Sequence, residues 1–340
     1  MSRIRRRFLA LSPGWTVVAG LLAVILTLHV ILRAPLEWSS ARPLLLSILR
    51  VTGLYVIIAV WLWIVLRAGL RLGNRQALLR SLAQHAGDGF CFASAIFLCL
   101  YLKLMVPLVR ASTFDRAYEA IDRRFFAWMD PLIAWRAHAL QFNWIDSMYL
   151  FAFFGMFCLS FIIHNLRGRA EFRRVFLATV LVQGAGAVLY MVAPAVGPFL
   201  FHQSANALAV GTQHSFYLLR QKELAAGGVL WFSAHAGEFV LCGLAAMPSL
   251  HVAASFVFLC YAWRYVRWLG YVYALIFGWI LFGAMATRWH YGIDLIAGVA
   301  LAYACIALSN WWIEAYEEAL ERGVEEKVPL CVPEEQPALA

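Results

Sequence analysis

Charged residues are scarce in this sequence. Only 14% of its 340 residues are Asp, Glu, Lys or Arg, whereas 63% are hydrophobic. A soluble domain usually has about a quarter of its residues charged, so the composition excludes an ordinary soluble protein. Apolar runs near the ~20 residues that cross a bilayer recur along the whole chain. The composition therefore predicts an all-α protein, a polytopic bundle of membrane-spanning helices.

Cysteine pairs with metal-binding or redox spacing are missing. The seven cysteines are scattered, and none forms a C-x-x-C pair. The sequence therefore supports neither a zinc knuckle nor a redox motif. His202, His214 and His235 share one segment, but their irregular spacing is a poor match to a zinc site. We expect no metal and no cofactor.

Acidic residues are outnumbered by basic ones. The 28 Lys and Arg residues against 19 Asp and Glu residues give a formal charge of +9. The basic residues form short clusters between apolar runs, which is typical of the cytoplasmic loops of membrane proteins rather than of a nucleic-acid-binding surface. We therefore expect the bilayer as a partner and no nucleic acid.

About eight segments qualify as membrane spans by length and apolar composition. They are residues 15–32, 44–66, 88–109, 145–166, 174–193, 248–265, 268–286 and 291–312. With these boundaries every arginine cluster falls on one side of the membrane, which predicts that both termini are cytoplasmic. The arginine-rich loops, and the absence of N-x-S/T from the outer segments, favour a bacterial inner membrane.

We divide the chain into an N-terminal pair of spans (1–87), a six-span catalytic core (88–313) and an acidic cytoplasmic tail (314–340).

Two segments on the outer side are long. Residues 110–144 mix apolar and charged positions at helical spacing, which predicts an amphipathic helix on the membrane surface. Residues 194–247 are too polar to span and end near His251, so they could form a lid or a headgroup site. In this second segment, Arg220 and Lys222 are candidates for holding phosphate oxygens. The alternative is that both are solvated loop charges.

Two histidines are expected to meet at one membrane face. His251 and His290 are separated by one out-and-back pair of apolar segments, which returns both to the same side. A helix beginning near Trp289 would stack His290 and Asp294, four residues apart, on one face. A carboxylate beside an imidazole fixes its tautomer and stabilises its charged form, which prepares the histidine for attack or proton transfer.

The start of the segment that carries His251 is suited to bind an anion. Pro248 fits the first turn of a helix, so Ser249 and His251 would lie at the helix N-terminus. Free N–H groups and the helix dipole favour a phosphate there. Together with His290 and Asp294, these residues predict a phosphoryl-transfer site. The other interpretation is that each is an ordinary polar residue at the membrane interface.

Two motifs carry a resemblance to a known family. Pro248-Ser249-Leu250-His251 and His290-Tyr291-Gly292-Ile293-Asp294-Leu295-Ile296-Ala297-Gly298 resemble the second and third motifs of the type 2 phosphatidic acid phosphatase superfamily. Their form is most similar to the inositol phosphorylceramide synthase-like branch. The resemblance implies a six-helix core that works without metal. It also implies that His290 is a nucleophile that forms a phosphohistidine, that Asp294 orients it, that His251 protonates the leaving alcohol, and that Ser249 contacts the phosphate.

The sequence departs from the superfamily in two places. The first motif, K-x6-R-P, is missing before the second; Lys103 and Arg110 have its spacing far upstream, but Ala111 follows them, so chance is the alternative. Ala284 stands where the third motif has an arginine, and Arg288 could replace it or be an interfacial anchor. These departures favour the synthase branch over a plain phosphatase.

The sequence leads to two hypotheses from different classes. The first is a membrane-embedded lipid phosphotransferase or phosphatase whose substrate is a phospholipid, a sphingolipid or a polyprenyl phosphate at the outer face, with water or a second alcohol as acceptor. The second is a transporter or lipid-binding membrane protein in which the histidines and Asp294 form a proton relay. A serine protease using Ser249 is a poor third, because Ser249 and His251 are too close in sequence to act as nucleophile and base. None of these hypotheses predicts an oligomeric state.

Overall fold

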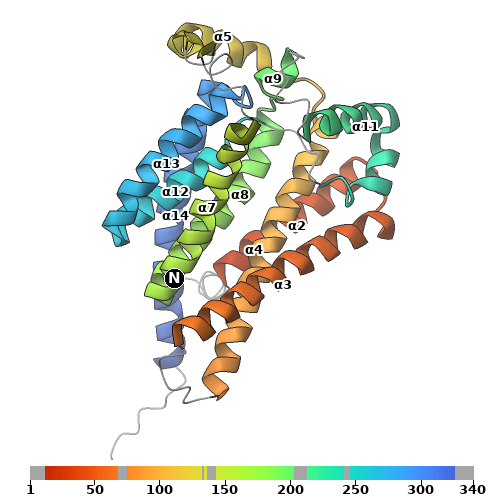
Figure 1. Cartoon of the computed structure of the whole chain (residues 1–340). Coiled ribbons are helices and arrows are strands. Elements are labelled where there is room, and N and C mark those ends of the chain that lie inside the picture. The colour runs from red at the N-terminus through yellow and green to blue at the C-terminus, as the bar shows by residue number, and fades with distance from the viewer. Residues whose placement is uncertain are drawn as a thin grey trace, which may run out of the picture.

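The structure is a bundle of long helices (Figure 1). The computed structural model describes residues 12–67, 75–131, 134–135, 143–202, 213–240 and 246–325. Its long helices in the bundle are α2 (Pro13–Ile31), α3 (Trp38–Arg67), α4 (Arg75–Val109), α7 (Asn143–Arg167), α8 (Arg169–Val192), α12 (Leu250–Tyr265), α13 (Arg267–Ala286) and α14 (Gly292–Glu325). The connecting elements are α5 (Asp115–Phe125), the 3-10 helix η1 (Ala127–Met129), α9 (Pro198–Phe201) and α11 (Gln213–His235).

Each of the eight predicted spans coincides with one of the long helices. Among the described residues, five segments are long and apolar enough to cross a membrane, and these are Pro13–Ile31, Ala83–Val109, Arg169–Val192, Arg267–Ala286 and Gly292–Glu321. The apolar part of α7, Phe151–Arg167, is shorter. The prediction of an all-α, polytopic membrane protein is confirmed.

The predicted domain boundaries fall inside continuous helices. Residue 87 lies within α4, and residue 314 lies within α14. Glu317, in the acidic segment, forms ion pairs with Arg173 at 3.7 Å and with Arg174 at 3.6 Å. The helical part of this segment is therefore packed onto α8, and residues 326–340 lie outside the described part. The division into a pair of spans, a core and a tail stays a prediction.

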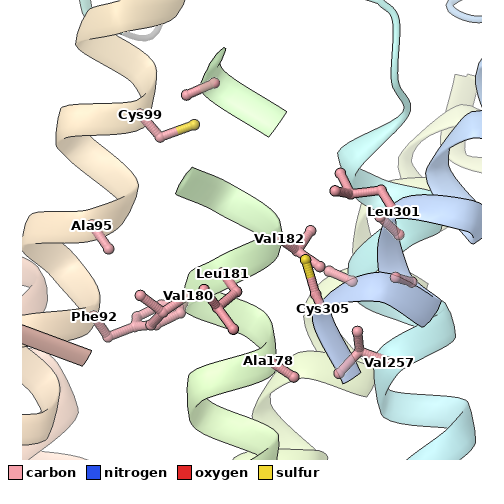
Figure 2. Close-up of a cluster of buried hydrophobic side chains, with 14 of the residues drawn as sticks. Phe92, Ala95, Cys99, Ala178, Val180, Leu181, Val182, Val257, Leu301 and Cys305 are labelled. Carbon is pink, nitrogen blue, oxygen red and sulfur yellow. The ribbon is translucent and has the colours of Figure 1, made fainter. Parts of the chain in front are cut away.

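Helix α8 lies at the centre of the bundle, where it contacts α2, α4, α7, α12 and α14. Figure 2 shows α8 between α4 on one side and α12 and α14 on the other. Val180 lies toward Phe92 of α4, and Val182 lies toward Cys305 of α14; both valines are fully buried. These contacts join the N-terminal and C-terminal spans into one core.

Small residues let α12 approach its neighbours closely. A Cβ at Gly186 of α8 would lie 2.3 Å from Cδ2 of Leu250, and a Cβ at Gly298 of α14 would lie 2.6 Å from the carbonyl oxygen of Ser249. Without the hydrophobic effect between helices in lipid, such close backbone packing is a main source of association. The start of α12 is therefore held between α8 and α14.

The two outer segments differ from one another in position. Helix α5 lies across one end of the bundle, above α12, α13 and α14, and the short α9 lies beside it, above the end of α8 (Figure 1). We call this end the α5 end. The predicted amphipathic helix is present as α5, which buries Asp115 and Tyr118. By contrast, α11 packs against α3 and α4. Helix α11, which belongs to the segment predicted as a lid or headgroup site, therefore lies against α3 and α4, whereas residues 203–212 and 241–245 of that segment lie outside the described part, so the lid or headgroup site stays a prediction.

Candidate active site

The two sequence motifs meet at the α5 end through a backbone hydrogen bond. The N–H of Ser249 donates to the carbonyl oxygen of Asp294, with an N···O distance of 3.1 Å. Ser249 is fully buried and has an extended backbone, and its hydroxyl accepts from the N–H of Val252 at 3.5 Å. It is thus the N-cap of α12, which begins at Leu250. Pro248 therefore precedes the cap, and its predicted place in the first helical turn is wrong.

His290 lies in a tight turn between α13 and α14. After α13 ends at Ala286, the N–H groups of Thr287, Arg288 and His290 still donate back to carbonyls of that helix. Arg288 has a φ of 60°, which reverses the chain. Helix α14 starts only at Gly292. The prediction that His290 belongs to the helix of Asp294 is therefore wrong, because the last turn of α13 retains it.

The pairing of His290 with Asp294 exists despite this different backbone. Nδ1 of His290 lies 3.3 Å from Oδ2 of Asp294, and the same oxygen accepts from the N–H of Tyr291 at 2.9 Å. His290 is 7% exposed and Asp294 is fully buried. Because a carboxylate oxygen accepts, Nδ1 is the donor and Nε2 keeps its lone pair. Asp294 therefore caps the start of α14 and orients the imidazole at once.

His251 faces the same site from α12. Its ring packs edge-on against Phe153 of α7, with ring centroids 4.7 Å apart, and lies 5.5 Å from the ring of Tyr149. It also interacts electrostatically with His290 and with Lys103 of α4. The structure therefore brings His251, His290 and Asp294 together at one end of the bundle, with Ser249 beside them.

A buried carboxylate of α5 holds the segments that surround the site. Asp115 is fully buried, and it accepts from the N–H of Val196 at 3.1 Å, the N–H of Gly197 at 3.0 Å and the hydroxyl of Tyr291 at 3.0 Å. Burial, together with the nearby charge of Asp115, raises the pKa of Tyr291, so its phenol remains a donor. Asp115 thereby connects the loop after α8 to the residue next to His290.

A second carboxylate of α5 holds the start of α14. Asp122 accepts from the N–H of Gly292 at 2.8 Å and from that of Ile293 at 3.3 Å. Burial raises the pKa of Asp122, and these two hydrogen bonds oppose the rise. A carboxylate at a helix N-terminus satisfies otherwise unpaired donors. Neither Asp115 nor Asp122 is among the predicted site residues; their seven-residue spacing on one face of an amphipathic helix is the signal that could have found them.

The loop after α8 is braced against the turn that holds His290. Gly197 has a φ of 90°, and a Cβ there would lie 2.3 Å from the carbonyl oxygen of Trp289. The N–H of Phe199 also donates to the carbonyl of Arg288 at 2.9 Å. A side chain at position 197 would therefore push the backbone next to His290.

We expect Gly197→Ala to lower activity about a hundredfold, because a displacement of about 1 Å at a reacting group has that order of effect. Gly228→Ala is the matched control. Gly228 also has a positive φ, 54°, but a Cβ there would meet nothing within 4 Å. Both substitutions should cost about 1–3 kcal/mol of backbone strain. Thermal unfolding in detergent, measured together with turnover of the lipid phosphate that the sequence predicts as substrate, separates strain from loss of activity. Equal activity losses in the two variants would contradict the bracing role.

Not all of the predicted phosphate-binding cations lie near His251 and His290. Arg288 lies in the turn and its side chain is exposed, whereas Lys222 is exposed on α11, which packs on α3 and α4. Arg220 also belongs to α11, and its side chain lies outside the described part. Lys103 and Arg110, which have the K-x6-R spacing, lie in different surroundings. Arg110 donates to the carbonyl of Val192 at 2.8 Å and stacks on a phenylalanine of the outer loop, while Lys103 lies near His251.

The loop histidines have separate partners. Nε2 of His202 lies 2.9 Å from Oε1 of Glu119, and Nδ1 of His235 lies 3.0 Å from the carbonyl oxygen of Trp231. The side chain of His214 is outside the described part. Within the residues that the structure describes, no three His, Cys, Asp or Glu side chains are grouped so as to hold a metal ion.

The fold and the site together define a class of protein, an integral membrane protein with a His–Asp pair and a second histidine at one end of its helices. The family model of the PAP2 superfamily, the type 2 phosphatidic acid phosphatases, matches residues 119–308, more than half of the 340-residue chain. The chain therefore belongs to the PAP2 superfamily, and it is a membrane enzyme of the phosphatase or phosphotransferase type. Comparisons with curated proteins and with solved structures gave no match. The predicted superfamily is confirmed, and the predicted branch within it stays a prediction.

Proposed function

We propose that this protein transfers a phosphoryl or phosphate-linked headgroup from a lipid through a covalent phosphohistidine on His290. The lipid is a phospholipid, a sphingolipid or a polyprenyl phosphate. The observation that carries the proposal is the contact between His290 Nδ1 and Asp294 Oδ2 at 3.3 Å, with His251 close enough to interact electrostatically with His290. An oriented nucleophile and a second imidazole are the groups that two-step phosphoryl transfer requires.

In the first step, Nε2 of His290 attacks the phosphorus. A P–N bond forms while the P–O bond to the leaving alcohol breaks, and the pair of electrons leaves with that oxygen. His251 supplies the proton that the oxygen takes up. Asp294 stabilises the imidazolium that develops on His290, because it accepts the hydrogen bond from Nδ1.

In the second step, water or an acceptor alcohol attacks the phosphorus. His251, now neutral, removes the proton of the attacking hydroxyl, and the P–N bond breaks to return His290 to its neutral form. With water the result is hydrolysis, and with an alcohol it is headgroup transfer. Both steps balance without an oxidant or a reductant.

The phosphate oxygens would be held at the start of α12 and at the rim of the site. Ser249 is the N-cap of α12, where backbone donors and the helix dipole favour an anion. Arg288, exposed beside His290, can approach the same oxygens from the membrane surface. Neither residue requires a metal ion to act in this way.

A phosphodiester substrate, and hence headgroup transfer of the inositol phosphorylceramide synthase-like kind, is our preferred form of the proposal. Ala284, where the third motif usually has an arginine, is fully buried, and Arg110 is engaged with the carbonyl of Val192. A site with fewer cations suits a phosphodiester, which carries one negative charge, better than a phosphomonoester, which carries up to two. This charge argument supports the synthase branch.

The membrane orientation is also part of the proposal. Arg167, Arg169, Arg264 and Arg267 lie at the ends of helices opposite the α5 end, and such clusters normally face the cytoplasm. The site would then face the periplasm of a bacterial inner membrane, where a lipid can enter sideways with its headgroup at catalytic depth. A cysteine at position 230 that reacts only from the cytoplasm would contradict this orientation.

The experiment that tests the proposal is an assay of the purified protein in detergent with radiolabelled lipids, read by thin-layer chromatography. We expect release of phosphate, or transfer of the phosphate headgroup to an added lipid alcohol. His235→Ala, whose ring contacts Trp231 away from the site, should retain the wild-type rate. A protein that binds or moves these lipids without changing them is a transporter, and the proposal would then be abandoned.

A further inference from the structure

Tyr149 of α7 has a buried hydroxyl that lacks a hydrogen-bond partner among the residues that the structure describes. The residue is only 5% exposed. Burial of a hydroxyl without a partner costs free energy, and surrounding lipid offers no hydrogen bond in its place. A phenylalanine would fill the same space without that cost. Polar groups that are buried in this way inside a membrane helix usually have a functional role.

The ring of Tyr149 is held between the two elements that carry the catalytic histidines. On one side, its centroid lies 5.5 Å from that of the His251 ring. On the other side, a Cβ at Gly283 of α13 would lie 2.9 Å from Cδ2 of Tyr149. The carbonyl oxygen of Gly283 accepts from the N–H and from the hydroxyl of Thr287, where the turn to His290 begins. The phenol is therefore fixed at the candidate active site.

The hydroxyl of Tyr149 belongs to the interior of this site. Tyr190 of α8 is close enough to interact electrostatically with both Tyr149 and Asp294. His251, beside the Tyr149 ring, interacts in the same way with His290. The unpaired hydroxyl is thus near the groups that would flank a phosphorus atom, on the His251 side.

Helix α7 lies between this site and the surrounding lipid. Tyr149 and Phe153, one turn apart, face inward and pack against His251. Phe151 and Phe154 lie on the other side of the helix by its 3.6-residue period, and both are exposed. An amphiphilic alcohol that comes from the bilayer past α7 would therefore meet the phenol of Tyr149 beside His251.

We infer that the hydroxyl of Tyr149 binds the oxygen of the acceptor alcohol, and that this acceptor is a lipid alcohol; the inference rests on the proposed function. The phenol O–H donates to the alcohol oxygen, which leaves the proton of the alcohol free to pass to His251. The partner that Tyr149 lacks is then the substrate. Tyr149 thereby favours transfer to an alcohol over hydrolysis, because water finds other partners and needs no phenol to hold it.

Tyr149→Phe removes only this hydroxyl, so it should shift the products from transfer towards hydrolysis. Loss of one neutral hydrogen bond to the substrate corresponds to a change of about tenfold. We expect the ratio of transfer to hydrolysis to fall by that factor, and KM for the alcohol to rise by it. A general disturbance of the site would lower both products alike and leave their ratio unchanged.

The matched control is Tyr261→Phe. Tyr261 is a buried tyrosine towards the other end of α12, and its hydroxyl donates to Oδ1 of Asn310 at 3.1 Å. Its removal should leave the product ratio at the wild-type value. The assay uses the whole protein in detergent, a phospholipid labelled on phosphorus, and dioctanoylglycerol, N-octanoylsphingosine or farnesol as the added alcohol. An unchanged ratio in folded Tyr149→Phe, or a wild type that hydrolyses the lipid but transfers to none of these alcohols, would overturn the inference.

Thermal unfolding separates this inference from the proposed function. Tyr149→Phe should raise the unfolding midpoint by about 1–4 °C, because an unpaired buried hydroxyl is removed, whereas Tyr261→Phe should lower it. The alcohol that is the best acceptor, or the best stabiliser if there is no turnover, should stabilise the wild type more than Tyr149→Phe. If no lipid is turned over, the proposed function fails while these measurements still test Tyr149.

Two results of the unfolding measurements would overturn the inference. The first is a midpoint of Tyr149→Phe that falls as far as that of Tyr261→Phe, since the hydroxyl would then have a partner within the protein. The second is equal stabilisation of the wild type and Tyr149→Phe by the alcohols, or none of either. If Tyr149→Phe does not fold, Tyr149→Leu takes its place in the product-ratio and alcohol-stabilisation measurements.

Discussion

His290→Ala is expected to lower the rate of lipid phosphate transfer by about a thousandfold or more, since the substitution removes the nucleophile. The wild type, mixed briefly with a lipid labelled on phosphorus, should also retain label on the protein. That label should be lost in acid and be stable in alkali, as a phosphohistidine is. The His290→Ala variant should carry no label.

The matched variant for this experiment is His235→Ala. His235 is a partly buried histidine at the end of α11, and its ring is hydrogen-bonded to the carbonyl oxygen of Trp231. Its substitution should leave both the rate and the label unchanged. Because Asp294 is fully buried beside His290, the thermal unfolding midpoint of His290→Ala must be compared with that of the wild type. A folded His290→Ala protein that still turns over lipid, or still takes up label, would rule out the covalent mechanism.

The spans could be predicted because hydropathy is a local property. A helix in lipid must satisfy all of its backbone hydrogen bonds within itself, so length and apolar composition nearly determine where it lies. The ends of helices were less predictable. Helix α4 begins at Arg75 and α14 continues to Glu325, because polar helical turns can extend beyond the bilayer without a change in local pattern. The sequence therefore indicated the positions of the long helices better than the extent of each one.

The candidate site was predictable where its residues are close in sequence or, like His251 and His290, are joined by a single pair of consecutive helices. The His290 and Asp294 pair is four residues apart, and its contact exists even though His290 lies in a turn rather than in a helix. The contacts of α5 join distant segments: Asp115 to Gly197 across 82 residues, and Asp122 to Gly292 across 170. Such contacts depend on how helices pack, which single-sequence patterns do not contain.

His251→Ala tests most directly whether His251 is the proton donor while His290 is the nucleophile. If His251 protonates the leaving oxygen, its loss should slow transfer from a natural lipid by about 10²- to 10⁴-fold. A lipid analogue that releases p-nitrophenol needs no proton on its leaving oxygen, so the first step should be largely restored. The second step should stay slow, because the attacking hydroxyl still has no base.

We therefore expect His251→Ala to give a burst of p-nitrophenol followed by slow release, with label accumulating on His290, whereas His290→Ala should give no burst. The ring of His251 packs against Phe153 and Tyr149, so its removal leaves a small void, and unfolding curves must show that the variant is folded. Equal losses on the natural lipid and on the p-nitrophenyl analogue would mean that His251 does not donate to the leaving group. Its place against α7 and near Lys103 would then indicate a role in holding the phosphate in line with His290 instead.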